Sequence, residues 1–268
     1  MNALIQHFAF EFRTGIRNKN LLMLNYLFPL GFYLMMGFIM PEINPLFRDT
    51  IIPSMVAFAV LAATLLGLPD PLVSAREAGI FRSYKINGIP ALAILVIPAL
   101  TTLLHLVIVA ALMVFSAPLL FDAPVAQHWG AFALVFLAFA VASVGIGVLI
   151  GVIAPSTRLT VLFSQALFLP SMLLGGMMMP LDMLPEAAGK VARLLPATQA
   201  MNAFNGLAMG GTAVFPAWGS VAALFASGLA AFALALFLFQ WDSHNAARRR
   251  PALLAVLAWI PYLATLFL

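Results

Sequence analysis

The sequence contains no cysteine, and only 8% of its 268 residues are charged. The missing cysteines exclude disulfides, thiolate metal sites and cysteine nucleophiles. The low charge excludes an ordinary soluble domain, in which about a quarter of the residues are charged. Hydrophobic residues make up 64% of the chain instead. This composition indicates a protein that is embedded in a membrane.

Charged residues are nearly absent from six long apolar stretches, which cover 21–40, 51–73, 92–120, 129–153, 159–178 and 221–239. An α-helix rises about 1.5 Å per residue, so about 20 apolar residues cross the hydrocarbon core of a bilayer. Most of the polar connections are short, and none is long enough to form a soluble domain. We therefore predict an all-α polytopic membrane protein with six core transmembrane helices over 21–240.

The two ends of the chain differ from these six stretches. Apolar residues recur at helical spacing from Leu4 to Ile16, which predicts an amphipathic interfacial helix over 1–20, with a short polar leader as the alternative. The segment 251–268 is uncharged and follows three arginines, so we predict a seventh hydrophobic helix that spans the membrane. Its short length and Pro261 leave a hairpin or an interfacial segment as the alternative.

Positive charge is divided unevenly between the two sides of the predicted bundle. If the N-terminus is cytoplasmic, ten of the 13 basic residues lie inside and three lie outside. The inside set is Arg13, Arg17, Lys19, Arg76, Arg82, Lys85, Arg158, Arg248, Arg249 and Arg250, and the outside set is Arg48, Lys190 and Arg193. The positive-inside rule therefore predicts a multi-pass protein of the bacterial inner membrane with a cytoplasmic N-terminus. We interpret the basic residues as topology signals and expect no nucleic-acid partner.

The connection over 69–90 is the more highly charged of two unusual segments. Pro69 and Pro71 are predicted to disturb the end of the second span near Asp70. A charged, helix-forming stretch over 75–88 follows and faces the cytoplasm in the predicted orientation. Such a helix is suited to insert into a groove on a soluble partner. An ordinary basic loop that only sets topology is the alternative.

The second unusual segment, 175–211, lies on the outer side and is rich in proline and glycine. Two short helices fit it, at about 185–195 and 197–209, and they are expected to dip partly into the membrane as re-entrant helices over 180–209. Non-helical backbone is tolerated at that depth only where protein or water covers it. The segment is therefore predicted to be a lid over a pathway, with a simple surface excursion as the alternative.

A few polar and flexible side chains within the spans are candidates to line a pathway. His105 is the one ionisable residue well inside a span, and such residues are functional candidates by default. A neutral histidine that bonds a neighbouring helix is the alternative. The other candidates are Thr160, Ser164, Gln165 and Met178. Hydroxyls can equally bond backbone carbonyls, and methionine is also common membrane filler.

The chain resembles the type-two ABC transporter permeases, in the branch that exports drugs and polysaccharides. A coupling helix joins the second and third spans in that family, and its Arg-Glu-x-Gly motif and basic stretch match Arg76, Glu77, Gly79, Arg82, Tyr84 and Lys85. The outer motif of the family matches Pro180, Leu184, Pro185, Leu195, Pro196, Thr198 and Asn202. The chain departs from the family at 80–82, where threonine, leucine and glutamate are common, and in its hydrophobic tail.

The resemblance implies a permease subunit that pairs with a second copy or a homologue and contacts membrane lipids. Two separate ATPase subunits would bind the coupling helices and hold ATP and magnesium. This chain has no G-x-x-x-x-G-K-[ST] loop, so we expect it to be neither an enzyme nor a cofactor-binding or metal-binding protein. The implied function is ATP-driven export of an amphipathic or hydrophobic compound, such as a drug-like molecule, a lipid or a lipid-linked glycan.

Two other functional classes fit the sequence less well. An ion-coupled secondary transporter would need paired carboxylates or broken helices at mid-membrane, whereas Asp70 is the only acid inside a predicted span. A membrane-embedded enzyme would need clustered acids and histidines. The four histidines, His7, His105, His128 and His244, are dispersed along the chain.

Overall fold

The computed structural model describes residues 13, 17–242 and 251–267, and within them helices are the only regular secondary structure. Six helical segments of this described part are long and apolar enough to cross a membrane. They are Lys19–Ile43 (α2, η1 and α3), Phe47–Glu77 (α4, η2 and α5), Ala91–Phe121 (α7), Trp129–Ile153 (α8), Thr157–Leu174 (α9) and Ala217–Leu238 (α12). The predicted all-α fold with six spans is therefore confirmed. Most of the predicted interfacial helix over 1–20 lies outside the described residues.

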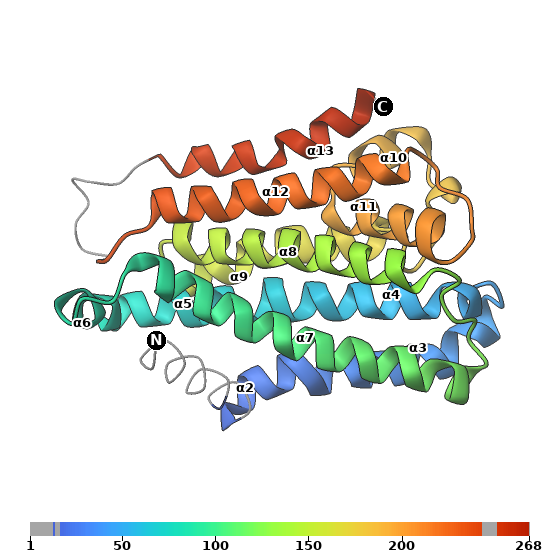
Figure 1. Cartoon of the computed structure of the whole chain (residues 1–268), viewed down its shortest axis with the longest axis horizontal. Helices are drawn as coiled ribbons and strands as arrows, with labels where there is room; N and C mark the ends of the chain where they lie inside the picture. The colour runs from blue at the N-terminus through green and yellow to red at the C-terminus, as the bar shows by residue number, and fades with distance from the viewer. Residues whose placement is uncertain (1–12, 14–16, 243–250, 268) are drawn as a thin grey trace.

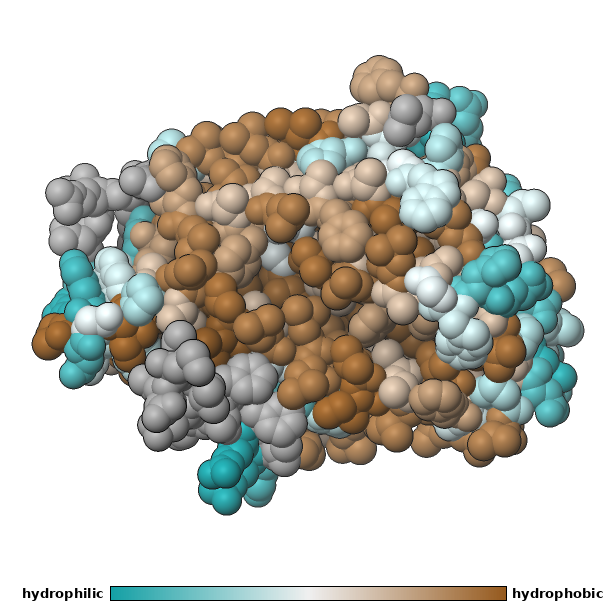
Figure 2. Space-filling view, in the orientation of Figure 1, coloured by the Kyte–Doolittle hydropathy of each residue, from teal (hydrophilic) through white to brown (hydrophobic). Residues whose placement is uncertain are grey.

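The long helices run side by side along one axis of the molecule (Figure 1). The short helix α6 (Ile80–Ile86) lies at one end of the bundle, and α10 (Glu186–Ala192) and α11 (Pro196–Ala203) lie at the other. Figure 2 shows a broad hydrophobic surface between these ends, with most hydrophilic residues gathered at the ends themselves. A protein that crosses a bilayer presents such a surface to the lipid.

The second span continues further than the sequence predicted. It consists of α4 (Phe47–Leu61), a π-helical turn η2 (Ala62–Gly67) and α5 (Pro69–Glu77). The helix is disturbed just before Pro69, by the π-turn and a bend at Leu68, but the span does not end there and continues to Glu77. Both prolines stand in the first turn of α5, just after the π-turn. The regular α-helical hydrogen bonds are already interrupted there, so the N–H groups that proline lacks cost little.

Helix α8 lies at the centre of the bundle and contacts its neighbours through small residues. A Cβ atom at Gly145 would overlap the carbonyl oxygen of Gly228 in α12, and one at Gly147 would overlap the carbonyl oxygen of Thr64 in η2. Gly151 lies close to the side chain of Leu72 in α5. Small residues allow two helix backbones to approach closely inside a membrane. This packing joins α8 to α12 on one side and to the second span on the other.

The outer segment contains η3 (Leu181–Met183), α10, α11 and a π-turn η4 (Phe204–Ala208), close to the two predicted short helices. Every residue of α11 is buried. Asn202 of α11 donates to the carbonyl of Phe215 (2.9 Å) and the hydroxyl of Ser220 (3.1 Å), and it accepts the N–H of Val214 (2.8 Å). The Asn202 side chain thus provides hydrogen-bond partners for backbone groups of the connection that leads into α12.

The tail forms η6 (Ala252–Trp259), α13 (Ile260–Ala264) and η7 (Thr265–Phe267) and runs alongside α12 (Figure 1). Its 16 residues are fewer than an α-helical span requires. Eleven of them are in 3₁₀ turns, which rise about 2 Å per residue, so the tail is about 30 Å long. Pro261 falls in the first turn of α13, where its missing N–H costs little.

The tight approach of α8 to η2 can be tested with two glycines of the same helix. Gly147→Ala should destabilise the protein by about 1–3 kcal/mol, because the new methyl group meets backbone that cannot move aside. Gly130→Ala is the control, since a Cβ atom there meets nothing within 4 Å. Thermal unfolding of the detergent-purified chain measures both effects. Equal thermal midpoints for the two variants would contradict the packing described.

Candidate functional site

A glycine turn joins α5 to the short helix α6. Gly79 has a φ of +75°, in the left-handed region that glycine adopts without strain, and nothing lies within 4 Å of where its Cβ would be. Glycine is therefore required here by the backbone conformation. A larger side chain would have room. A second glycine, Gly88 (φ +72°), ends α6 in a Schellman motif in which Ile89 N–H donates to the carbonyl of Tyr84 (3.0 Å).

Arg76, the first residue of the predicted coupling motif, points into the protein. It is buried, and its guanidinium donates hydrogen bonds to the carbonyls of Gly151 (3.4 Å), Val152 (2.7 Å) and Ala154. The last carbonyls of a helix have no partner within that helix, and the negative end of the helix dipole favours a cation. Arg76 therefore fixes the end of α5 on the end of α8, in contrast to Glu77, which is exposed.

Helix α6 is held on its other side by the segment that follows α12. The rings of Phe81 and Phe239 lie 5.4 Å apart, and Arg82 forms an ion pair with Asp242. The ammonium of Lys85 lies 5.8 Å from the ring centre of Trp241. The helix is thus attached to the second span through its glycine turn and to the sixth span through these contacts.

The outward surface of α6 carries both charged and apolar side chains. Glu77, Arg82 and Lys85 are exposed, as are two large apolar residues, Ile80 (42%) and Ile86 (81%). The structure therefore brings all six predicted coupling residues to one end of the bundle. Arg76 anchors the helix end, Gly79 forms the turn, and Glu77, Arg82 and Lys85 are exposed. Tyr84 differs from Arg82 and Lys85 because it is half-buried and lines a cavity.

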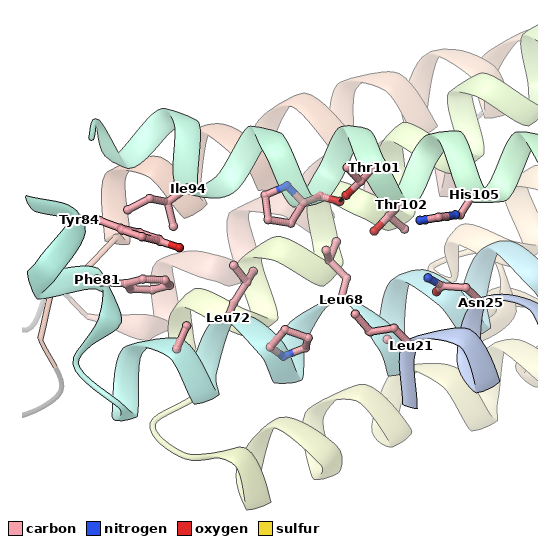
Figure 3. Close-up of a pocket in the computed structure, with 14 residues that line it drawn as sticks. Leu21, Asn25, Leu68, Leu72, Phe81, Tyr84, Ile94, Thr101, Thr102 and His105 are labelled. Carbon is pink, nitrogen blue, oxygen red and sulfur yellow. Dashed lines mark hydrogen bonds between the residues drawn. The ribbon is translucent and has the colours of Figure 1, made fainter. Parts of the chain in front are cut away.

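That cavity has a volume of about 110 Å³ and lies between the first three spans and α6 (Figure 3). Asn25, Thr101, Thr102 and His105 form its polar end, and Phe81 lies with Tyr84 at the opposite end. Asn25 belongs to a π-turn, η1 (Met23–Leu27), which contacts the π-turn η2 of the second span. π-Turns inside α-helices are frequent at functional sites.

The predicted pathway residues are not gathered in one place. His105 lines the cavity, and its Nδ1 atom lies 2.6 Å from the hydroxyl of Tyr26, so it bonds a neighbouring helix as the alternative interpretation proposed. Thr160 and Ser164 lie on the buried side of α9, where the Thr160 hydroxyl donates to Ser156 O (2.9 Å). Gln165 is half-buried on α9.

The last predicted pathway residue, Met178, lines a separate depression of about 530 Å³ at the outer end of the bundle. The sequence prediction missed Asn25, Tyr26 and Thr102 near the polar end of the cavity. Asn25 and Tyr26 interrupt the apolar stretch 21–40, which is a signal that could have singled them out. Thr102 carries no signal that separates it from its neighbour Thr101.

The contrast between Arg76 and Arg82 yields a prediction about stability. Arg76→Ala should destabilise the protein by on the order of 2 kcal/mol, because it leaves buried carbonyls at the end of α8 without a donor. Arg82→Ala should cost at most about 1 kcal/mol, since its ion pair is largely exposed. Thermal unfolding in detergent compares the two variants, and equal losses would refute the structural contribution assigned to Arg76.

Comparison with known proteins is consistent with this arrangement. No curated protein and no solved structure matched the chain. A family model described as ABC-2 type transporter matches residues 3–209, which is well over half of the sequence and includes α6, the cavity and the outer helices. The match confirms the resemblance drawn from the coupling and outer motifs. The chain therefore belongs to the ABC-2 type transporter family, as a membrane-spanning permease subunit of an ABC transporter.

Proposed function

We propose that the chain is the membrane subunit of an ATP-driven exporter and that separate ATPase subunits, which hold ATP and magnesium, bind it at α6. The observation that carries this proposal is the placement of α6. This short helix lies at the end of the bundle, exposes Ile86 among charged side chains, and is attached to both the second and the sixth span. Motion of a bound partner would therefore reach two spans through one helix.

The orientation supports a cytoplasmic position for this end. Arg76, Arg82, Lys85 and Arg158 all belong to the α6 end of the described chain, which is the side that the positive-inside rule assigns to the cytoplasm. The opposite end carries the outer helices α10 and α11. We place the protein in the bacterial inner membrane with its N-terminus in the cytoplasm.

The substrate we propose is an amphipathic or hydrophobic compound. The depression at the outer end supports this class, because Met177, Met178 and Met179 line it beside Phe47. Thioether side chains adapt to ligands of different shape. Ion-coupled transport has less support, since Asp70 is exposed in α5 toward the α6 end and does not pair with a second acid among the described residues at mid-membrane.

A second copy of the chain, or a homologue, would complete the transport pathway. The outward side of α9 supports this partner, because Val161, Leu162, Leu169 and Leu173 are all about half or more exposed. Gln165 of the same helix is half-buried and is a candidate to line the pathway, whereas Thr160 and Ser164 face the interior of the subunit. Membrane lipids would cover the remaining apolar surface.

Co-purification tests the ATPase partner directly. The tagged chain is isolated from its native cells in a mild detergent, beside a Glu77→Ala, Ile86→Asp double variant that changes only exposed side chains. We expect an ATP-hydrolysing subunit to co-purify with the unaltered chain and to be lost from the double variant. The charge at Ile86→Asp would disrupt an apolar contact at the centre of the proposed docking surface.

The matched control is Glu186→Ala, which also alters an exposed residue but lies at the opposite end of the bundle. This variant should retain the ATPase subunit in full. The assignment of the docking surface fails if both variants lose the subunit equally. The exporter proposal itself fails if no ATP-hydrolysing subunit accompanies the unaltered chain under several gentle conditions.

The tail gives a prediction about topology. Pro251 lines a groove beside Arg76 and Gln240 at the α6 end, whereas Thr265 accepts a hydrogen bond from Gln199 of α11 at the other end (2.9 Å). We therefore expect the C-terminus to lie outside the cell. Alkaline phosphatase fused after Leu268 should be active, and the same reporter fused after Gln240 should be inactive. Equal activity of the two fusions would contradict a tail that crosses the membrane.

A further inference from the structure

Two polar side chains at the end of the cavity, Asn25 and Thr102, are largely buried but open onto the cavity. Asn25 is 6% exposed and Thr102 is 7% exposed, and both line the cavity. Within the described part of the chain, neither the Asn25 carboxamide nor the Thr102 hydroxyl has a partner. Because these groups face the cavity and not other protein groups, the hydrogen-bond partner available to them is whatever occupies the cavity.

Two neighbouring polar side chains, Thr101 and His105, differ because each already makes a hydrogen bond within the protein. The hydroxyl of Thr101 donates to carbonyl oxygens of its own helix, at Ile97 (3.2 Å) and Pro98 (3.0 Å). The Nδ1 atom of His105 is engaged by Tyr26. Among the polar groups at this end of the cavity, we assign the ligand contact to Asn25 and Thr102.

The position of Asn25 depends on a glycine in the facing π-turn. The side-chain oxygen of Asn25 lies 3.3 Å from where a Cβ atom of Gly67 would be. Any larger residue at Gly67 would therefore press on the carboxamide. The two π-turns together place the carboxamide at the polar end of the cavity, opposite the threonines of α7, as Figure 3 shows.

The rest of the wall determines the kind of ligand that fits. Leu68, Leu72 and Ile94 form an aliphatic middle, and Phe81 and Tyr84 of α6 form an aromatic end. No lysine, arginine, aspartate or glutamate is among the described residues that line the cavity, so a charged group would be buried there without a counter-ion. The volume of about 110 Å³ is smaller than an apolar cavity of about 150 Å³ that accommodates benzene.

We propose that this cavity is a binding site for an uncharged amphiphile that carries a hydroxyl or amide group. The hydroxyl or amide accepts from the Asn25 carboxamide and bonds the Thr102 hydroxyl, while a short apolar chain extends between Leu68, Leu72 and Ile94. Phe81 and Tyr84 close the cavity beyond the end of the chain. A ligand of this kind satisfies both open polar groups and fills the apolar part of the space.

The site has a direct connection to the proposed exporter. Because Phe81 and Tyr84 belong to α6, an occupied cavity would support that helix from the side opposite its exposed surface. The binding itself does not depend on the exporter assignment. Only the interpretation of the ligand as a transported or regulatory compound rests on the proposed function.

Photolabelling of the purified full chain tests the site without ATP and without a partner subunit. The probe is a four-carbon primary alcohol that carries a diazirine, and mass spectrometry locates the labelled residues. We expect saturable labelling of cavity residues from η1, α5 and α7. An excess of 1-butanol should remove this labelling, whereas butane, butanoate and butylamine should compete at least about tenfold less well, because they lack an uncharged hydrogen-bonding group.

Two adjacent threonines provide matched variants. Thr102→Val removes the open hydroxyl with almost no change of shape and should weaken labelling about tenfold, the loss expected for one hydrogen bond. Thr101→Val removes a hydroxyl that is already bonded to its own helix and should leave the probe affinity unchanged. Both variants should fold, and Thr102→Val should unfold at a temperature no lower than the unaltered chain, since an idle buried hydroxyl is replaced by a methyl group.

Several outcomes would overturn the proposal. Non-saturable labelling of outward residues such as Leu104 would mean that the alcohol only partitions into the detergent around the chain. Equal affinities of the Thr101→Val and Thr102→Val variants would mean that the Thr102 hydroxyl does not bind the head group. The absence of any saturable labelling in the cavity would mean that the cavity holds only water. Saturable binding in a chain that recruits no ATPase would instead uphold the site and reject the exporter assignment.

Discussion

The contact on which the rest of the structure depends is that of Arg76 with the end of α8. A helix end inside or beside a membrane needs partners for its last carbonyls, and here a side chain from α5 supplies them with a full positive charge. Helix α8 in turn packs directly on α12 where Gly145 meets Gly228. The second, fourth and sixth spans therefore form one tightly joined block. Helix α6 is attached to that block through the turn at Gly79 and again through the residues that follow α12.

The opposite side of α6 is constructed differently. There the first and second spans meet through two π-turns, and the neighbouring space is a cavity instead of close glycine contacts. A π-turn widens a helix locally and interrupts its regular packing. Helix α6 thus lies between a rigid block, which begins with Arg76 and α8, and a less densely filled region lined by Phe81 and Tyr84.

The sequence was sufficient to predict the six spans because span length and the absence of charge are local properties. The motifs also gave the family resemblance, which the family match confirms. The inward direction of Arg76 could not be predicted, because it depends on where α8 ends in space. The π-turns have no sequence signature, so the continuation of the second span past Pro69 was missed. Thr101 and Thr102 are adjacent and identical in type, and only the fold decides which hydroxyl its own helix uses.

The sixth span connects the two ends of the molecule. At the outer end, Ser220 of α12 accepts a hydrogen bond from Asn202 of α11, and deeper in the bundle Ser227 donates to the tail at Ala258 (2.8 Å). The tail returns to α11 through the bond from Gln199 to Thr265. At the other end, the residues after α12 hold α6. A displacement of α6 that shifts α12 along its axis would therefore strain the contacts of α11, so this chain of contacts links α6 to the outer helices.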